Sequence, residues 1–82
     1  MSVCEIYVRR GCPYCERALV YLKKHNVRCH IIDVGDRNIR DLKIRELRSR
    51  GFSVSLNSTV PIVIINNRYL SGGSDELLRL KL

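Results

Sequence analysis

Two cysteines three positions apart, Cys12 and Cys15, lie where an extended segment of this 82-residue chain gives way to a helical one. Residues 4–8 (CEIYV) are β-prone and run into an Arg-Arg-Gly break, which predicts a strand entering a loop. From residue 13 to about residue 26, the apolar positions follow one helix face: Cys15, Ala18, Leu19 and Leu22. The cysteine pair therefore lies at a strand-to-helix junction.

The middle of the chain continues this alternation. Residues 27–34 predict a second buried strand, which contains Ile31, Ile32 and Val34. Residues 36–50 predict a second helix that ends before Gly51. Its apolar positions are Ile39, Leu42, Ile44 and Leu47. Residues 52–58 are compatible with either a loop or an additional strand.

The last third of the chain predicts a hairpin and a helix. Asn66-Asn67, between the apolar run 60–65 and residues 68–70, is a turn sequence that tolerates positive φ. A final helix is expected to begin around Ser74, Asp75 and Glu76. The order is then β-α-β-α-β-β-α, an α/β fold in which the first two strands are parallel and the hairpin adds two more strands. A chain of this length has apolar material for one core, so we expect a single domain over residues 1–82.

The charge balance favours anionic partners. Fifteen lysines and arginines against eight acidic residues give a formal net charge of +7. The chain lacks the basic start and apolar run of a signal peptide, and no apolar run approaches the roughly 20 residues that span a bilayer. We therefore expect a cytoplasmic protein with no membrane partner. The second helix carries many arginines without a nucleic-acid recognition motif, so we expect a solvated face rather than a nucleic-acid interface.

The positions of the two cysteines predict different roles for them. Cys12 lies at the start of a helix, where unpaired backbone N–H groups and the helix dipole stabilise a thiolate, and Arg9 and Arg10 add positive charge nearby. Pro13 suits the first helical position. Cys15 lies one turn further in, on the apolar face. We therefore expect Cys12 to attack an external disulfide and Cys15 to resolve the mixed disulfide from inside.

Three motifs together resemble the glutaredoxin family. They are Cys12-Pro13-Tyr14-Cys15 at the strand-helix junction, Thr59-Val60-Pro61 before the third strand, and Gly72-Gly73-Ser74-Asp75 before the last helix. The resemblance covers most of the chain. It implies a thioredoxin-like fold, with a four-stranded mixed sheet flanked by three helices, and reduction of disulfides at the expense of glutathione.

The resemblance also implies roles for individual residues. Cys12 would take up glutathione and Cys15 would be the resolving thiol. Tyr14 and Thr59 would flank the tripeptide, Pro61 would be a cis proline, and Val60 would pair with the cysteinyl part through its backbone. Gly73, Ser74 and Asp75 would hold the γ-glutamyl end. Arg9, or a basic residue of the second helix, would meet the glycyl carboxylate; the sequence leaves open which of Arg45, Arg48 and Arg50 reaches it.

The implied partners follow from this chemistry. Glutathione is the reducing co-substrate, glutathione reductase regenerates it indirectly, and no metal or bound cofactor is required. The clients are glutathionylated or disulfide-containing proteins. Reductases such as ribonucleotide reductase are among the clients that the resemblance allows, although no residue of this sequence identifies one. We expect a monomer.

Three alternative functions are compatible with the same residues. One is a glutaredoxin-like redoxin reduced by thioredoxin reductase. Another is a zinc-binding module, since Cys12 and Cys15 are followed by His25 and His30 at near zinc-finger spacing, with a middle spacer shorter than the usual ~12 residues. A nucleic-acid-binding module is the third.

The remaining cysteines, Cys4 and Cys29, are expected to be small strand residues with free thiols. A disulfide between them would need the first two strands to pair in register, and structural disulfides are rare in a reducing cytosol.

Overall fold

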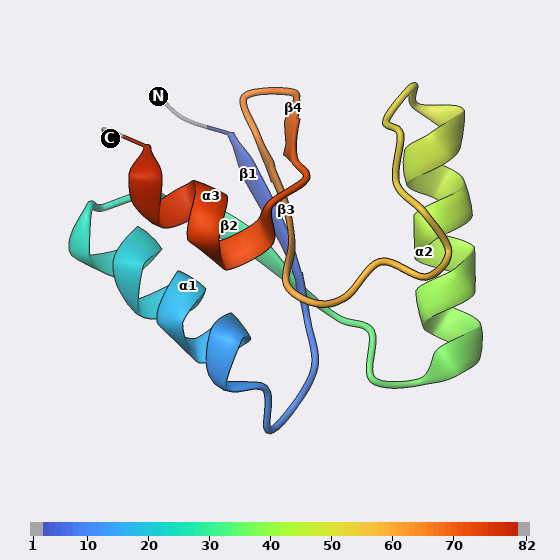
Figure 1. The fold of residues 1–82 in the computed structure, drawn as a ribbon, viewed down its shortest axis with the longest axis horizontal. Helices are drawn as coiled ribbons and strands as arrows, with labels where there is room; N and C mark the ends of the chain where they lie inside the picture. The colour runs from blue at the N-terminus through green and yellow to red at the C-terminus, as the bar shows by residue number, and fades with distance from the viewer. Residues whose placement is uncertain (1–2, 81–82) are drawn as a thin grey trace.

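The computed structural model describes residues 3–80 and confirms the expected order of elements (Figure 1). The ends of the expected domain, residues 1, 2, 81 and 82, lie outside the described residues. The elements are β1 (Cys4–Val8), α1 (Pro13–Lys24), β2 (Cys29–Asp33), α2 (Arg37–Ser49), β3 (Ile62–Ile65), β4 (Arg68–Leu70) and α3 (Gly73–Arg79).

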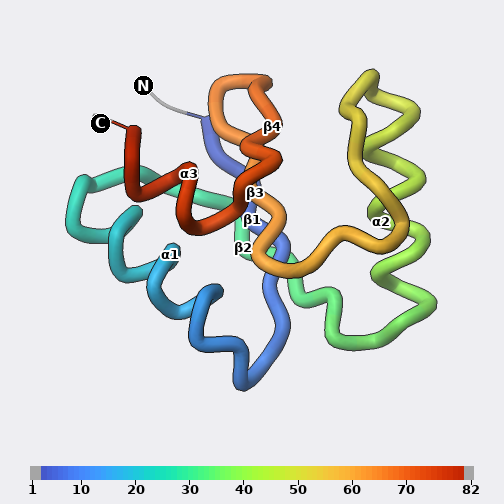
Figure 2. The backbone as a smooth tube through the Cα atoms, in the orientation of Figure 1, coloured from blue at the N-terminus to red at the C-terminus, as the bar shows by residue number. Residues whose placement is uncertain are grey.

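The strands form one mixed sheet in the order β2-β1-β3-β4. β1 and β2 are parallel, whereas β1–β3 and β3–β4 are antiparallel. In Figures 1 and 2, α1 and α3 lie together on one side of the sheet and α2 lies on the other. This arrangement is the expected four-stranded sheet flanked by three helices.

Alternation along the strands supplies a core to each face of the sheet. Towards α1 and α3, the buried residues are Cys4, Ile6, Ala18, Leu22, Val63, Ile65, Leu70 and Leu77. Towards α2, they are Tyr7, Val34, Ile44, Leu47, Val54, Ile62 and Ile64. Since β3 contributes to both cores, all four of its residues are buried, as expected for a central strand covered on both faces.

The prediction of a second buried strand was wrong in one respect. β2 is an edge strand with β1 as its neighbour, and Ile31 is 60% exposed. The apolar residues of this segment therefore do not all enter the core: Ile32 packs against the α2 side, but Ile31 does not. The segment before β3 is a loop, and its residue Val54 is buried in the core on the α2 side.

The predicted apolar set of the second helix was also partly wrong. Ile44 and Leu47 are buried, but Ile39 and Leu42 are 45% and 56% exposed. Successive residues of an α-helix are separated by about 100°, so Leu42, two positions before Ile44, lies on the other side of the helix. The buried face is therefore narrower than the apolar residues alone indicate.

The hairpin between β3 and β4 forms as predicted. Asn66 and Asn67 have φ values of 51° and 63°, in the left-handed region that asparagine tolerates. The turn aligns Ile65 opposite Arg68 and Val63 opposite Leu70. It also brings the Asn66 side chain to the start of β1, where its oxygen accepts a hydrogen bond from the Val3 N–H.

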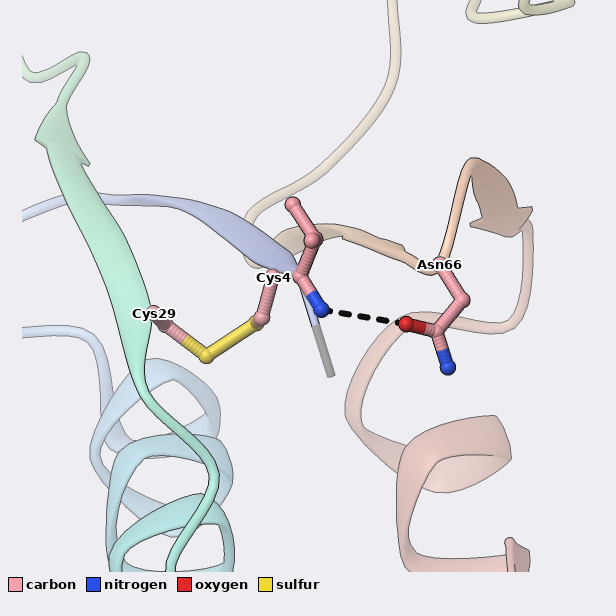
Figure 3. The surroundings of a disulfide bond; sticks show 4 residues. Cys4, Cys29 and Asn66 are labelled. Carbon is pink, nitrogen blue, oxygen red and sulfur yellow. Dashed lines mark hydrogen bonds between the residues drawn. A yellow bond between two sulfur atoms is a disulfide. The ribbon is translucent and has the colours of Figure 1, made fainter. Parts of the chain in front are cut away.

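Cys4 and Cys29 form a disulfide, which corrects the expectation of two free thiols (Figure 3). The parallel register places Cys4 directly beside Cys29, with 4.4 Å between their Cα atoms. Paired residues of neighbouring strands project to the same face, so the two sulfur atoms meet on the α1 side of the sheet. Sequence spacing alone does not reveal this register.

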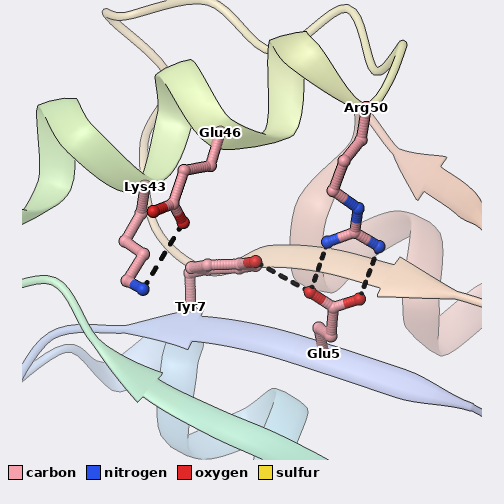
Figure 4. A network of polar contacts seen from close by, with 5 residues as sticks. All are labelled: Glu5, Tyr7, Lys43, Glu46 and Arg50. Atoms are coloured by element: carbon pink, nitrogen blue, oxygen red, sulfur yellow. Dashed lines mark hydrogen bonds and ion pairs between the residues drawn. The ribbon is translucent and has the colours of Figure 1, made fainter.

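A polar cluster fastens the end of α2 to the sheet (Figure 4). Arg50, just after α2, donates two hydrogen bonds of 2.8 Å to the Glu5 carboxylate, and the Tyr7 hydroxyl donates a third, of 2.9 Å. The hydrogen bonds from Arg50, followed by that from Tyr7, lower the pKa of Glu5 below its ordinary 4.5, against an opposing effect of burial. Burial, followed by the hydrogen bond to Glu5, raises the pKa of Tyr7 to about 12.

We expect Glu5→Gln to lower the free energy of unfolding at pH 7 by about 1 kcal/mol, the upper range for a solvent-screened pair with bidentate geometry. Because the folded pKa of Glu5 is depressed, this stabilisation is fully present above the unfolded value of 4.5 and is lost as the pH falls through the folded value. Denaturant titrations at neutral and acid pH measure both effects.

Glu46→Gln is the matched control, since it removes the same charge from the exposed pair with Lys43, 3.4 Å away. It should cost no more than about 0.5 kcal/mol. Equal losses in the two variants, or a loss in Glu5→Gln that persists in acid, would contradict the assignment.

Candidate active site

Cys12 and Cys15 lie at the amino end of α1, at the carboxyl edge of the parallel strands. Cys12 is the N-cap residue and Pro13 is the first residue of the helix. The Cys15 backbone N–H donates a hydrogen bond of 3.2 Å to the Cys12 sulfur. A donor aimed at this sulfur from the first turn of a helix stabilises negative charge on it. The first turn of α1 therefore presents a backbone hydrogen-bond donor to the Cys12 sulfur.

The two sulfur atoms differ in access. Cys12, although only 4% exposed, borders an open cavity, whereas Cys15, 2% exposed, lies behind it and borders neither of the cavities described below. Burial, followed by the hydrogen bond with Cys12, raises the pKa of the Cys15 thiol to about 11. At neutral pH Cys15 is therefore a protonated thiol behind the accessible sulfur, which suits a resolving residue rather than an attacking one.

The first cavity, about 710 Å³, lies beside Cys12 and is called here the basic cavity. Its walls come from the active-site loop and the start of α1, from the turn between β2 and α2, and from the segment before β3. They are Arg9, Cys12, Pro13, Tyr14, Val34, Gly35, Arg37, Arg40 and Asn57 to Val60.

The second cavity, about 460 Å³, continues from the first towards α3 and is called here the α3 cavity. The two share Tyr14 and residues 57–60. The α3 cavity adds Pro61, residues 69–72 and the start of α3, Gly73, Ser74 and Asp75. The two cavities adjoin at these shared residues and together are called here the groove; Cys12 and the arginines line the basic cavity, and Asp75 lines the α3 cavity.

The structure brings together nearly all of the residues predicted for the site. Arg9, Cys12, Tyr14, Thr59 and Val60 line the basic cavity, and Pro61, Gly73, Ser74 and Asp75 line the α3 cavity. The Val60–Pro61 peptide bond is cis, as the resemblance implies, and the Val60 carbonyl oxygen lies 4.0 Å from the Cys12 sulfur.

Glycine suits position 73 because of its backbone conformation and its close neighbour. Gly73 has a φ of 62°, and a Cβ atom there would lie 3.3 Å from the Pro61 carbonyl oxygen. A side chain would therefore be strained by the positive φ and would press on the 59–61 segment. Gly73 and Pro61 both line the α3 cavity.

Arg40 fixes the segment opposite Cys12. Its Nη2 donates hydrogen bonds to the carbonyl oxygens of Leu56 and Ser58, at 2.8 and 2.9 Å. These bonds hold the loop that carries Thr59 and Val60 against the amino-terminal part of α2. Arg40 is therefore a positioning residue for this wall of the groove.

None of the three arginines considered from the sequence borders the groove. Arg45 lines neither cavity, Arg48 lines a separate hollow beside Phe52, and Arg50 is bound to Glu5. The basic residues that α2 supplies are Arg37 and Arg40. A topological signal identifies them: α2 starts directly after β2, and ligand sites of α/β sheets lie beyond the carboxyl ends of parallel strands.

The spacing that resembles a zinc finger does not produce a cluster of ligands. His25 follows α1 and packs against Tyr21 with the rings tilted by 49° and 4.4 Å between their centroids, whereas His30 lies in β2. Within residues 3–80, no three or more His, Cys, Asp or Glu side chains are placed to hold a metal ion. None of the helices in this part of the chain is long and apolar enough to cross a membrane.

The fold and the site together define a thioredoxin-like α/β protein, with a dithiol pair at the start of α1 and a cis proline facing it. Within this class, the Glutaredoxin family model matches residues 4–70. The chain belongs to the glutaredoxin family.

Similar proteins agree with this assignment. A glutaredoxin-like protein of Encephalitozoon cuniculi is 34% identical over 77 residues, covering 94% of this chain and 53% of the relative, so the chain spans about half of its length. Glutaredoxin 1 of Rickettsia prowazekii is 34% identical over 76 residues, covering 93% of this chain and 74% of the relative. The crystal structure of glutaredoxin 1 from Francisella tularensis complexed with cacodylate has a TM-score of 0.78 at 29% identity, covering 95% and 90% of the two chains.

Proposed function

We propose that this protein is a glutathione-dependent thiol-disulfide oxidoreductase that acts on glutathione mixed disulfides and on protein disulfides through Cys12 and Cys15. One observation carries the proposal: Arg9 lines the cavity beside the accessible Cys12 sulfur, and Asp75 lines the adjoining α3 cavity, so the two parts of the groove carry opposite charges. Glutathione matches this pattern, because its γ-glutamyl end bears an ammonium group and its glycyl end a carboxylate.

The placement of glutathione follows from that match together with the family resemblance. Arg9 meets the glycyl carboxylate, and the backbone of Val60 pairs with the cysteinyl part, beside Tyr14 and Thr59. Next to Pro61, the segment Gly73 to Asp75 receives the γ-glutamyl group, with the Asp75 carboxylate accepting from its ammonium. The tripeptide sulfur then faces Cys12.

Removal of glutathione from a client needs Cys12 alone. The Cys12 thiolate attacks the glutathionyl sulfur of the mixed disulfide, the client leaves as a thiolate that takes a proton from water, and Cys12 becomes glutathionylated. A second glutathione thiolate then attacks the glutathionyl sulfur on Cys12. Glutathione disulfide leaves, and the Cys12 thiolate is restored.

Reduction of a protein disulfide uses both cysteines. The Cys12 thiolate attacks one client sulfur and forms a mixed disulfide, and the other client sulfur leaves as a thiolate that takes a proton from water. Cys15 gives its proton to water and attacks the Cys12 sulfur as a thiolate. The remaining client sulfur leaves as a thiolate, takes a proton from water, and a Cys12–Cys15 disulfide remains. Two glutathione molecules reopen this disulfide in successive exchanges and are released as glutathione disulfide.

The proposed partners are glutathione, glutathionylated or disulfide-containing proteins such as ribonucleotide reductase, and glutathione reductase as the indirect source of electrons. We propose a cytoplasmic monomer, without a metal or prosthetic group and without a nucleic-acid or membrane partner.

The test is turnover of a glutathione mixed disulfide of 2-mercaptoethanol with reduced glutathione, followed as NADPH consumption through glutathione reductase. We expect steady turnover proportional to enzyme concentration. If folded protein with free Cys12 and Cys15 gives no turnover in this assay but reduces a disulfide with thioredoxin reductase and NADPH, the redoxin alternative replaces the proposal.

A further inference from the structure

The basic cavity holds more positive charge than glutathione uses. Arg9, Arg37 and Arg40 line it, and none of its lining residues is acidic. Among residues 3–80, ion pairs within 4.0 Å join Arg50 to Glu5 and Lys43 to Glu46, so acidic side chains do not neutralise the three cavity arginines. The charge beside Cys12 is therefore available to a ligand.

Two aspartates adjacent in sequence to residues that line this cavity have other partners. Asp36 is the N-cap of α2 and accepts hydrogen bonds from the N–H groups of Asn38 and Ile39, at 2.8 and 3.1 Å. Asp33 accepts from the Gly35 N–H at 2.8 Å. Neither aspartate lines the cavity. These aspartates reduce the positive electrostatic potential around the cavity, but the charged side chains that line it are all arginines.

The three arginines differ in what they are free to bind. Arg40 already donates to two loop carbonyls, and Arg9 is the proposed partner of the glycyl carboxylate. Arg37, the first residue of α2, is exposed and no hydrogen bond or ion pair of its side chain is found within the described residues. Glutathione has one carboxylate at its glycyl end, and Arg9 is the proposed partner of that carboxylate. Arg37 is therefore not needed to bind glutathione.

We propose that Arg37 selects client proteins in which acidic residues flank the glutathionylated or disulfide-bonded cysteine. This inference rests on the proposed function and specifies its substrate class. Cys12 and Arg37 line the same cavity, so a client attached through its sulfur to Cys12 or to glutathione brings its neighbouring residues towards Arg37. Opposite charges at this position accelerate encounter and disfavour basic segments.

The location of Arg37 favours a peptide over a nucleic acid as the anionic partner. The reactive sulfur and the surplus guanidinium line the same cavity, so a ligand that uses both carries a sulfur atom within a few residues of its negative charge. An acidic peptide segment around a cysteine meets this requirement.

The experiment compares two glutathionylated peptides of equal length, whose single cysteine is flanked by glutamates in one and by lysines in the other. The readout is the ratio of their kcat/KM values, in which any effect on the shared glutathionyl group cancels. For the unsubstituted enzyme at about 0.01 M ionic strength, where the Debye length is about 30 Å, we expect the acidic peptide to be preferred by about tenfold. Near 1 M salt, with a Debye length of about 3 Å, the ratio should approach unity.

Arg37→Glu should lower this ratio by about tenfold or more, and Arg37→Lys, which keeps the charge, should preserve it. Arg48→Glu is the matched control, because it changes the net charge equally on the same helix but lines a separate hollow beside Phe52. Circular dichroism verifies that each variant is folded.

Equal turnover of the two peptides by the unsubstituted enzyme would overturn the inference, as would an equal shift in Arg48→Glu. The small neutral mixed disulfide of 2-mercaptoethanol separates this failure from failure of the proposed function. If that substrate is turned over while the peptides are not distinguished, the proposed function stands and the acidic-client inference fails. If neither it nor a peptide is turned over, the proposed function itself fails.

Discussion

Cys12→Ser should reduce turnover of a glutathione mixed disulfide to below about one-hundredth of the unsubstituted rate, because a serine hydroxyl does not ionise near neutral pH and forms no disulfide. Cys12 is the sulfur that borders the groove and accepts the hydrogen bond from the Cys15 N–H. Serine preserves the shape of the N-cap, so the loss reports the chemistry of sulfur rather than the fold. The glutathione-reductase-coupled assay measures it.

Cys15→Ser is the matched variant and should behave differently. Cys15 borders neither cavity, and its thiol, with a pKa of about 11, is protonated at neutral pH. Its replacement should therefore change turnover of a glutathione mixed disulfide by no more than about tenfold, since that reaction needs only the accessible thiolate. Reduction of a protein disulfide by Cys15→Ser should instead stop at a mixed disulfide with Cys12, detectable by intact mass. Equal losses of both activities in both variants would contradict the separate roles.

Local patterns predicted the framework of this site because their physics is local. Pro13 sets the first helical position, Asn66-Asn67 supplies the positive φ of the hairpin, and Gly73 supplies the positive φ at the start of α3. Each of these backbone conformations depends on only a few neighbouring residues in the sequence. The order of strands and helices follows from the same short-range signals, and it already determines that Cys12 lies at the carboxyl edge of the parallel pair.

Features that depend on distant segments were predicted less well. The exposure of Ile31 depends on β2 being at the edge of the sheet, which its apolar sequence does not indicate. The sequence does not distinguish the arginines of α2 and its C-cap from one another. Only the first turns of the helix reach the groove, so Arg37 and Arg40 line it, while the C-cap residue Arg50 binds Glu5. The direction of the α2 axis relative to the sheet therefore determines which of these arginines line the groove.

The Cys4–Cys29 disulfide is the clearest example of such a long-range feature, and it leads to the largest expected effect on stability. The bond joins β1 to the edge strand β2 and closes a chain segment with a sequence separation of 25 residues (Figure 3). Restricting the unfolded chain over a loop of this size is worth about 3.5 kcal/mol in the loop-entropy treatment. For a domain of this length, that corresponds to a melting temperature higher by about 15–25 °C.

We therefore expect Cys4→Ala/Cys29→Ala to lower the melting temperature by about this amount, measured by circular dichroism. Cys4 is 1% exposed within the core under α1, so the substitution also removes packing, whereas a reductant breaks the cross-link and leaves both side chains in place. The two contributions are separated in the Cys12→Ser/Cys15→Ser background, where the reductant acts on the Cys4–Cys29 pair. If reduction alone does not lower the melting temperature, the cross-link is not the source of the stability.

Activity provides the second readout of the same experiment, in protein that retains Cys12 and Cys15. Cys4 begins β1, and Cys12 follows the other end of that strand. The two cysteine pairs therefore lie at opposite ends of β1. At temperatures where it remains folded, Cys4→Ala/Cys29→Ala should therefore retain turnover of a glutathione mixed disulfide. Loss of turnover in folded protein would mean that the Cys4–Cys29 disulfide affects the arrangement of the groove beside Cys12. Retained turnover with a lowered melting temperature would mean that one cysteine pair carries the chemistry while the other stabilises the fold, and that stability follows the redox state of the surroundings.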